Sequence, residues 1–311
     1  MEGVGKARND AAMLLVGRIL GGIIWFHSGE FVTSRVVFEQ CYAMNNPATR
    51  AACATVMPED PHAVILSLLS PHLGHIDAAR SRAEEVLSEA SQVGHVYQLA
   101  WASNWACWTE CAVGSPYDLR RHAEQLVCLS SEHGFPNLLA WGLIYRGWSM
   151  VSLAEPEKGR GLITRGLSMH RDTGSVTSIA FALTLLADAC GRLELATEGL
   201  NYLVEAERII ETSNDRYHEA ELHRVRGDLL NATGDQVAAE DSYHQALVVA
   251  RRQSARIFEL HVATSLARLW RDQGKRAEAR DLLAPIYGWF TEGFDTPVLK
   301  EAKALLDELP P

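Results

Sequence analysis

The sequence predicts an all-α protein, a right-handed superhelix of about seven antiparallel helical hairpins with a C-terminal capping helix. Few segments alternate apolar and polar residues with the period of two that marks a strand. Short turns recur along the chain with a period of about forty residues, which is the signature of a repeat array. Small residues keep step with those turns on both sides. These three observations together favour stacked helical hairpins over any fold that contains a sheet.

The turns set the register of the predicted hairpins. Their central residues lie 45, 40, 40, 37, 43 and 40 positions apart. In chain order these residues are Gly29, Gly74, Gly114, Ala154, Gly191, Gly234 and Gly274. Each turn therefore separates the two helices of one hairpin, and a last helix over Pro297 to Leu309 is predicted to cap the array.

Small side chains flank each turn at constant distances. Seven residues before the turns stand Gly22, Ser67, Cys107, Gly147, Thr184, Gly227 and Ala267. Five residues after them stand Ser34, Ala79, Leu119, Gly159, Ala196, Ala239 and Ala279, of which only Leu119 is large. Small residues at these positions let two antiparallel helices approach closely. Each hairpin then buries its apolar face against its neighbours in the stack.

The sixth unit, from Gly227 through Gly234-Asp235 to Ala239, Tyr243 and Ala246, resembles a tetratricopeptide repeat (TPR). That family usually repeats every ~34 residues, so the longer period here requires longer helices or longer links. The resemblance implies a TPR-like superhelix whose concave side is lined by the first helix of each hairpin.

Three longer stretches carry a narrower resemblance. They are HGFPNLLAWGLIYRGWSM (His133 to Met150), AELHRVRGDLL (Ala220 to Leu230) and the segment from Ala263 to Leu309. They look like the C-terminal repeat region of bacterial ATPase-coupled adenylate/guanylate cyclases and of related large ATP-dependent regulators. No phosphate-binding loop is present, because Gly3-Val-Gly5-Lys6 lacks both the spacing and the hydroxyl residue. The resemblance therefore implies a regulatory module and carries over no catalytic residue.

The composition of the chain limits the classes of partner that the protein is expected to bind. The net charge of −10 argues against a nucleic-acid ligand, whose binding depends on Lys and Arg that neutralise phosphates. No uncharged apolar run reaches the ~18 residues that cross a membrane. Arg18 interrupts the apolar run near the start, which is read as a helix of the fold rather than a signal peptide. Six scattered cysteines predict reduced thiols in a cytoplasmic protein. The sequence leaves open whether the chain forms a homo-oligomer.

We expect one repeat domain over residues 1–311. Prolines and asparagines between the first two hairpins, at Asn45-Asn46-Pro47 and Pro58-Glu59-Asp60-Pro61, predict a flexible joint over residues 45–61.

The candidate binding site rests on tryptophans in the middle of the array. Trp101 and Trp108 are seven residues apart, as are Trp141 and Trp148, which is about two helical turns. By analogy with tetratricopeptide arrays these rings face the concave groove, which becomes charged toward the C-terminus. The predicted ligand-binding residues are Trp101, Asn104, Trp108, Trp141, Ile144, Arg146, Trp148 and Phe181. The alternative is that the rings are packing, because tryptophan is usually well buried.

Other groups of residues give weaker evidence for a metal site or a catalytic site. His72, His75 and Asp77 lie close together in sequence but lack a fourth metal ligand. Ser168 and His170 are too close in sequence to form a convincing hydrolase pair, and Ser168 falls inside a predicted helix rather than on a nucleophile elbow. We therefore expect no catalytic residues, no metal and no cofactor.

The sequence thus predicts a non-catalytic interaction or sensory module that binds a protein segment, a peptide or a small apolar effector in its concave groove. In larger relatives such a module would regulate an attached ATPase or cyclase. The alternatives are a free-standing small-molecule-binding protein and, with less support, a hydrolase built in the aromatic groove.

Overall fold

The computed structural model describes residues 10–44, 46–53 and 72–309, together with residues 3, 5 and 8 near the N-terminus. This part of the chain is all-helical and contains no strand. Its helices are α2 (Ala11–His27), α3 (Phe31–Met44), α4 (Pro47–Cys53), α6 (Ile76–Val93), α7 (Val96–Val113), α8 (Pro116–His133), α9 (Pro136–Ser152), α10 (Pro156–Asp172), α11 (Ile179–Gly191), α12 (Ala196–Ser213), α13 (Glu219–Ala232), α14 (Gln236–Arg252), α15 (Arg256–Asp272), α16 (Arg276–Tyr287) and α17 (Pro297–Glu308). The predicted all-α repeat fold is confirmed, and α17 matches the predicted cap.

The repeat is more regular than the sequence indicates. A residue in the left-handed conformation stands in the turn of each hairpin, at positions 29, 74, 114, 154, 194, 234 and 274, so the last six are forty residues apart. The fifth turn was therefore placed wrongly at Gly191, because the left-handed residue is Glu194, with φ of 60°. Gly191 instead ends α11, where a Cβ atom would approach Leu229 to 2.9 Å. Gly191 therefore has a packing role rather than a turn role.

Close approach of the two helices in a hairpin is confirmed at the small residues. A Cβ atom on Gly147 of α9 would lie 2.6 Å from the backbone oxygen of Gly159 on α10. The reverse contact, from Gly159 to the oxygen of Gly147, would measure 2.5 Å. In the sixth hairpin, Gly227 of α13 leaves room for the ring of Tyr243 on α14. The glycines therefore set how tightly these helix pairs can pack.

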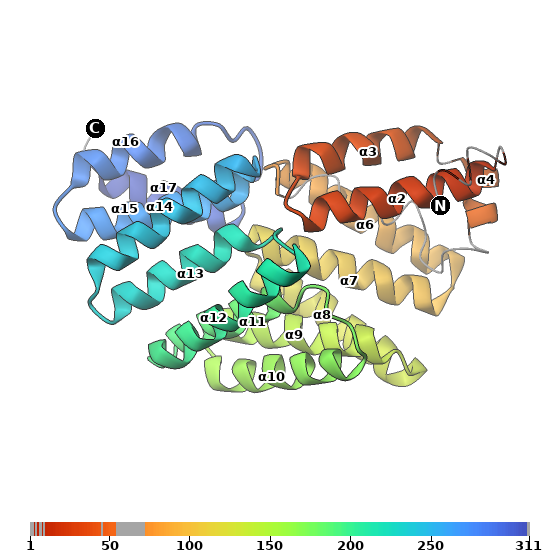
Figure 1. The fold of residues 1–311 in the computed structure, drawn as a ribbon, viewed down its shortest axis with the longest axis horizontal. Helices are drawn as coiled ribbons and strands as arrows, with labels where there is room; N and C mark the ends of the chain where they lie inside the picture. The colour runs from red at the N-terminus through yellow and green to blue at the C-terminus, as the bar shows by residue number, and fades with distance from the viewer. Residues whose placement is uncertain are drawn as a thin grey trace.

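The array curls until its N-terminal hairpins meet its C-terminal ones. Figure 1 shows α2 and α3 on one side and α14 to α16 on the other, with α8 to α12 joining them below. The backbone oxygen of His27, at the end of α2, accepts a hydrogen bond of 2.6 Å from the N–H of Arg216, and the His27 ring lies 2.8 Å from Asp215. Asp77 at the start of α6 accepts a bond of 3.2 Å from the N–H of Gly293, before α17. These contacts turn the expected open groove into a bounded cavity.

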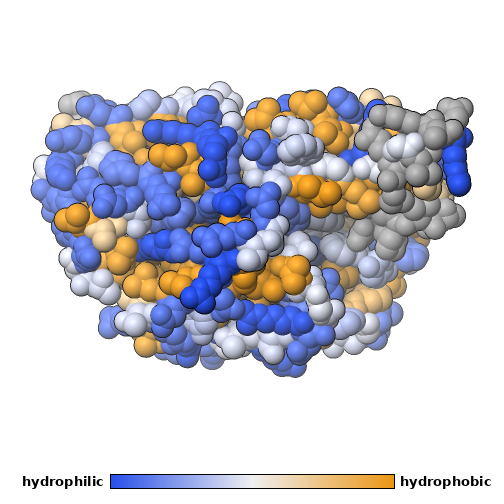
Figure 2. Space-filling model, viewed as in Figure 1, coloured by the Kyte–Doolittle hydropathy of each residue, from blue (hydrophilic) through white to orange (hydrophobic). Residues whose placement is uncertain are grey.

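Two further predictions concern the first hairpins. The proposed joint at residues 45–61 falls partly on α4, which packs against α2, and otherwise lies outside the described residues. No described helix is long and apolar enough to span a membrane. Figure 2 shows hydrophobic residues on the surface over α2 and α3, where Ile24, Trp25 and Val32 are among the exposed large apolar side chains.

Candidate functional site

A cavity of about 680 Å³ lies at the centre of the curled array. Its wall is formed mainly by the first helix of five successive hairpins, α7, α9, α11, α13 and α15, with α17 closing one side. Buried residues such as Phe258 and Tyr217 border its inner part, whereas Tyr117 and Glu301 at its edge are exposed to solvent. The volume falls within the range of small-molecule sites in proteins, which is roughly 300–1,000 Å³.

One row of residues runs across this wall because each hairpin repeats the same position. Trp108, Trp148, Asp188, Asp228 and Arg268 are each forty residues apart, and all five border the cavity. We call these five residues the inner row. It begins with two tryptophans, continues with two aspartates and ends with an arginine that pairs with Glu301 of α17. The forty-residue period therefore places an aromatic surface directly beside an acidic one.

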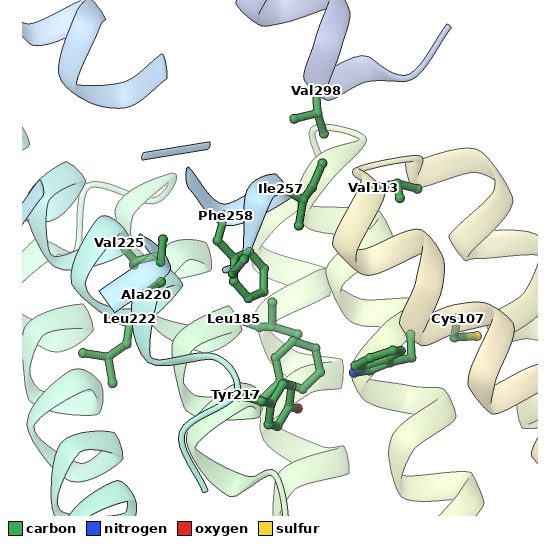
Figure 3. Packing of buried hydrophobic residues seen from close by; sticks show 14 of the residues in the cluster. Cys107, Val113, Leu185, Tyr217, Ala220, Leu222, Val225, Ile257, Phe258 and Val298 are labelled. Atoms are coloured by element: carbon green, nitrogen blue, oxygen red, sulfur yellow. The ribbon is translucent and has the colours of Figure 1, made fainter. Parts of the chain in front are cut away.

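The aromatic end of the cavity is continuous with the core that holds the array closed. The Trp108 ring lies 5.0 Å from Phe26 of α2 and 4.7 Å from His72, measured between ring centroids. His72 in turn lies 4.8 Å from Phe258 of α15. Figure 3 shows Tyr217, Leu185 and Phe258 pointing toward one another from three separate parts of the chain. Aromatic packing thus joins the first hairpins to the last and lines the cavity with the same rings.

The opposite side of the cavity holds a buried ionic network. Glu221 of α13 accepts hydrogen bonds from Arg224, at 2.8 Å, and from His261 of α15, at 3.0 Å. Arg224 also donates to Asp228, whose other oxygen accepts a bond of 2.6 Å from the Tyr243 hydroxyl. Burial alone would raise the pKa of Glu221, but Arg224 and His261 outweigh it and hold that pKa well below its usual range. The network therefore keeps Glu221 ionised inside the protein.

A second buried ion pair lies where α6 meets α7. Glu110, which is 6% exposed, accepts a hydrogen bond of 3.0 Å from Arg80, and both residues border the cavity. Burial raises the pKa of Glu110 in spite of this pair. Arg80 also reaches Asp295, before α17, at 3.7 Å. Arg80 therefore links Glu110 in the wall of the cavity to Asp295 in the segment before α17.

The predicted site residues divide into two groups. Trp108, Trp148 and Phe181 border the cavity. The other five, Trp101, Asn104, Trp141, Ile144 and Arg146, do not border it. Trp141 packs on His170 and Phe181, with ring centroids 5.0 and 6.0 Å apart, and Ile144 is fully buried. Trp141 therefore belongs to the packing between hairpins, and Trp101 packs on Tyr97 and Trp105 of its own helix.

The weaker candidates lie apart from one another. His72 is buried in the aromatic cluster, His75 contacts Arg35, and Asp77 accepts from the backbone of Gly293. Within the described ranges, no group of three His, Cys, Asp or Glu side chains could hold a metal ion. Ser168 is exposed in the middle of α10, whereas the buried His170 ring bonds Asn137 and the Thr177 carbonyl oxygen. Residues two apart on a helix do not face each other.

Several residues of the site escaped sequence reasoning. Tyr217 and His218 lie in the loop before α13, outside every helix used for the register. Asp188, Glu221, Arg224 and Asp228 lie where the sequence predicts a charged part of the groove, but the predicted binding residues are mainly aromatic and do not include them. The forty-residue spacing from Trp148 to Asp188 and Asp228 was the signal that could have found the acidic part of the inner row.

No protein-family model matches this sequence, and a search of curated proteins finds no match. Several solved structures share the fold. The apo form of RapI is 13% identical, with a TM-score of 0.55 over 94% of this chain and 99% of that one. A Rap protein complexed with competence and sporulation factor is 11% identical, with a TM-score of 0.57 over 96% and 97%. Aspartyl phosphate phosphatase F from Bacillus subtilis is 12% identical, with a TM-score of 0.56 over 91% and 72%. At these identities the likeness establishes a TPR-like helical repeat fold.

Proposed function

We propose that this protein is a regulatory module that binds a small effector, or a short segment of a partner protein, in the cavity enclosed by its repeats. The observation that carries this proposal is the inner row. Five successive hairpins each turn one side chain into the same cavity, and those side chains are aromatic and charged. An apolar wall with a few convergent polar groups is the usual form of a ligand site.

The closed shape supports a sensory role. Contacts between distant hairpins, such as His27 with Asp215 and Asp77 with Gly293, hold the array in its closed form. A ligand that binds the closed form better than an open one shifts the array toward closure. A Rap protein of the same fold is complexed with competence and sporulation factor, which favours a bound factor here as well.

We further propose that residues 1–311 form one repeat domain that acts in the cytoplasm without a catalytic centre of its own. The separation of Ser168 from His170 on α10 supports the absence of hydrolase chemistry. In a larger protein of the kind that the sequence resembles, ligand binding would change the geometry of the array and so bias an attached ATPase or cyclase.

A ligand screen against a blocked cavity tests the proposal. Ser152 of α9 borders the cavity one helical turn beyond Trp148, so a Ser152→Trp side chain would fill part of it. Ser168→Trp, exposed on the partner helix α10, is the matched control. A metabolite and peptide library is screened by thermal shift and tryptophan fluorescence. A true ligand at about 100 times its Kd stabilises the protein by ~2.7 kcal/mol.

We expect such a ligand to stabilise the wild type and Ser168→Trp, and to lose its effect on Ser152→Trp. A ligand that stabilises all three proteins equally binds elsewhere, and that result would remove the support for the cavity as the site.

A further inference from the structure

Asp188 is a carboxylate in the wall of the cavity that no cation among the described residues contacts by a hydrogen bond. It projects from α11 between the tryptophans and the second aspartate of the inner row. Its only ion pair among the described residues is with Arg192, whose Nε lies 3.8 Å from Oδ1, beyond hydrogen-bond distance. Its neighbours Glu221 and Asp228 are instead each bonded directly to Arg224. Burial raises the pKa of Asp188 above its usual value, although the positive charges of Arg192 and Arg224 oppose this effect.

A cation already lies beside Asp188, within ion-pair range but beyond hydrogen-bond distance. The guanidinium carbon of Arg192 is 5.7 Å from the centre of the Trp148 ring, within range of a cation–π contact. The Arg192 side chain is 48% exposed, so it reaches this position from the solvent side. The geometry between the Trp148 ring and the Asp188 carboxylate therefore suits a positive group, and the half-exposed side chain of Arg192 lies there.

The charge of the cavity wall and a buried histidine also favour a polar, positively charged ligand. The residues that border the cavity include seven carboxylates and four arginines, so the wall carries an excess of negative charge. His72, next to Trp108, is 3% exposed and borders the cavity. Its Nδ1 atom has no hydrogen-bond partner within the described part of the chain. A buried polar atom without a partner costs free energy that a ligand group can recover.

We propose that the cavity binds a small organic cation, an amine or guanidinium joined to an apolar body, with its positive group between Trp148 and Asp188. The ligand's cation takes the place of the Arg192 guanidinium, and its apolar body extends toward Trp108 and Phe258. This proposal rests on the proposed function and names the chemical class of its effector. The size of the cavity favours a free small molecule, because a volume of about 680 Å³ suits a drug-sized ligand.

Three probes of similar size and different charge test the class of ligand. They are phenethylamine, phenethyl alcohol and phenylacetate, titrated by calorimetry into the full chain. We expect the amine to bind about tenfold more tightly than the alcohol, and the carboxylate to bind most weakly. Asp188→Asn should lower amine affinity to that of the alcohol and leave the alcohol unchanged. Arg192→Ala should raise amine affinity several-fold, because it removes the competing guanidinium.

Asp307→Asn, an exposed acid on α17, is the matched charge control and should bind all three probes like the wild type. Circular dichroism of each variant shows whether it is folded. A blocked phenylalanyl-arginine amide is titrated in parallel as the peptide arm.

The outcomes separate this proposal from the proposed function. If the amine and the alcohol bind the wild type equally, or if Asp188→Asn keeps the preference for the amine, the cation site is wrong while a ligand cavity stands. If only the blocked peptide binds, the occupant is a protein segment and the small-cation proposal is overturned. If no probe binds at about ten millimolar, and no ligand from the library binds either, both proposals fail.

Discussion

The two sides of the cavity are built from the same positions of successive hairpins, yet they hold the molecule together in different ways. On α7 and α9 these positions carry Trp108 and Trp148, and the aromatic side is continuous with the core through Phe26 and His72. On α13 the same position carries Asp228, which is bonded to Arg224 within the ionic network around Glu221. A repeat backbone therefore determines where side chains meet, and the sequence of each hairpin decides which interaction is made there.

The largest expected effect comes from separating the helices of the hairpin that carries Trp148. Gly147→Val places a branched side chain against the backbone oxygen of Gly159, which cannot move without shifting α10. We expect a loss of about 3 kcal/mol or more in the free energy of unfolding, measured in urea. Gly161→Ala on the exposed face of α10 has open space around it and should raise stability by up to ~1 kcal/mol. Equal effects of the two changes would contradict the close packing of this hairpin.

The next comparison lies within the aromatic side. Trp108 is 7% exposed and contacts rings from other hairpins, so Trp108→Leu should cost about 3 kcal/mol. Trp148 is less buried, and Trp148→Leu should cost about 1 kcal/mol. Both are measured by chemical unfolding followed by far-UV circular dichroism. A larger loss of stability for Trp148→Leu than for Trp108→Leu would contradict this prediction, because Trp148 would then contribute more to the stability of the fold.

On the ionic side, Glu221→Gln should cost about 2 kcal/mol at neutral pH, because it leaves Arg224 and His261 with a weaker acceptor inside the protein. The pKa of Glu221 is depressed in the folded state, so its contribution is present above about pH 4.3 and is lost as the pH falls further. The exposed pair Lys303–Asp307 gives the reference, and Asp307→Asn should change stability by less than ~0.5 kcal/mol. Unfolding curves at pH 7 that show no difference between the two variants would mean that the buried network adds nothing.

The smallest expected effect is a pH dependence from His218, which lies where the two sides meet. Burial lowers its pKa to about 4. The unfolded chain therefore takes up a proton near pH 6.5 that the folded protein resists, and stability falls as the pH drops from about 6.5 toward 4. His218→Gln should flatten that slope by up to ~1 kcal/mol per pH unit, measured from unfolding curves across this pH range. An unchanged slope would place the acid sensitivity on other groups.

Sequence reasoning reached the fold because repetition multiplies a weak signal. One short turn predicts little, but seven turns in step with small residues such as Gly147, Gly159 and Gly227 predict a stack of hairpins. The predicted position of the fifth turn was wrong because its left-handed residue is Glu194 rather than a glycine. A residue other than glycine can adopt this conformation when the packing of the helices on either side holds it there. Sequence reasoning could not find the closure either, because the bond from Arg216 to the His27 oxygen is made by backbone atoms that any residue has.

The site was predictable only in part for a related reason. The heptad spacing of the tryptophans gives their face on a helix but not how far along the helix the cavity extends. Trp108 and Trp148, near the ends of α7 and α9, border it, and Trp101 and Trp141 do not. The depth of a cavity depends on which distant segments cover it, and here the covering loops come from the far end of the chain.

The contacts that close the array join residues 188 and 216 positions apart in the chain. During synthesis the early hairpins can form from local contacts as soon as they emerge, since each packs on its immediate neighbours. The bond from Gly293 to Asp77 cannot form before residue 293 has been made. The cavity is therefore incomplete in a chain that stops before α17, and the ability to take up a ligand would show that all of these repeats are in place.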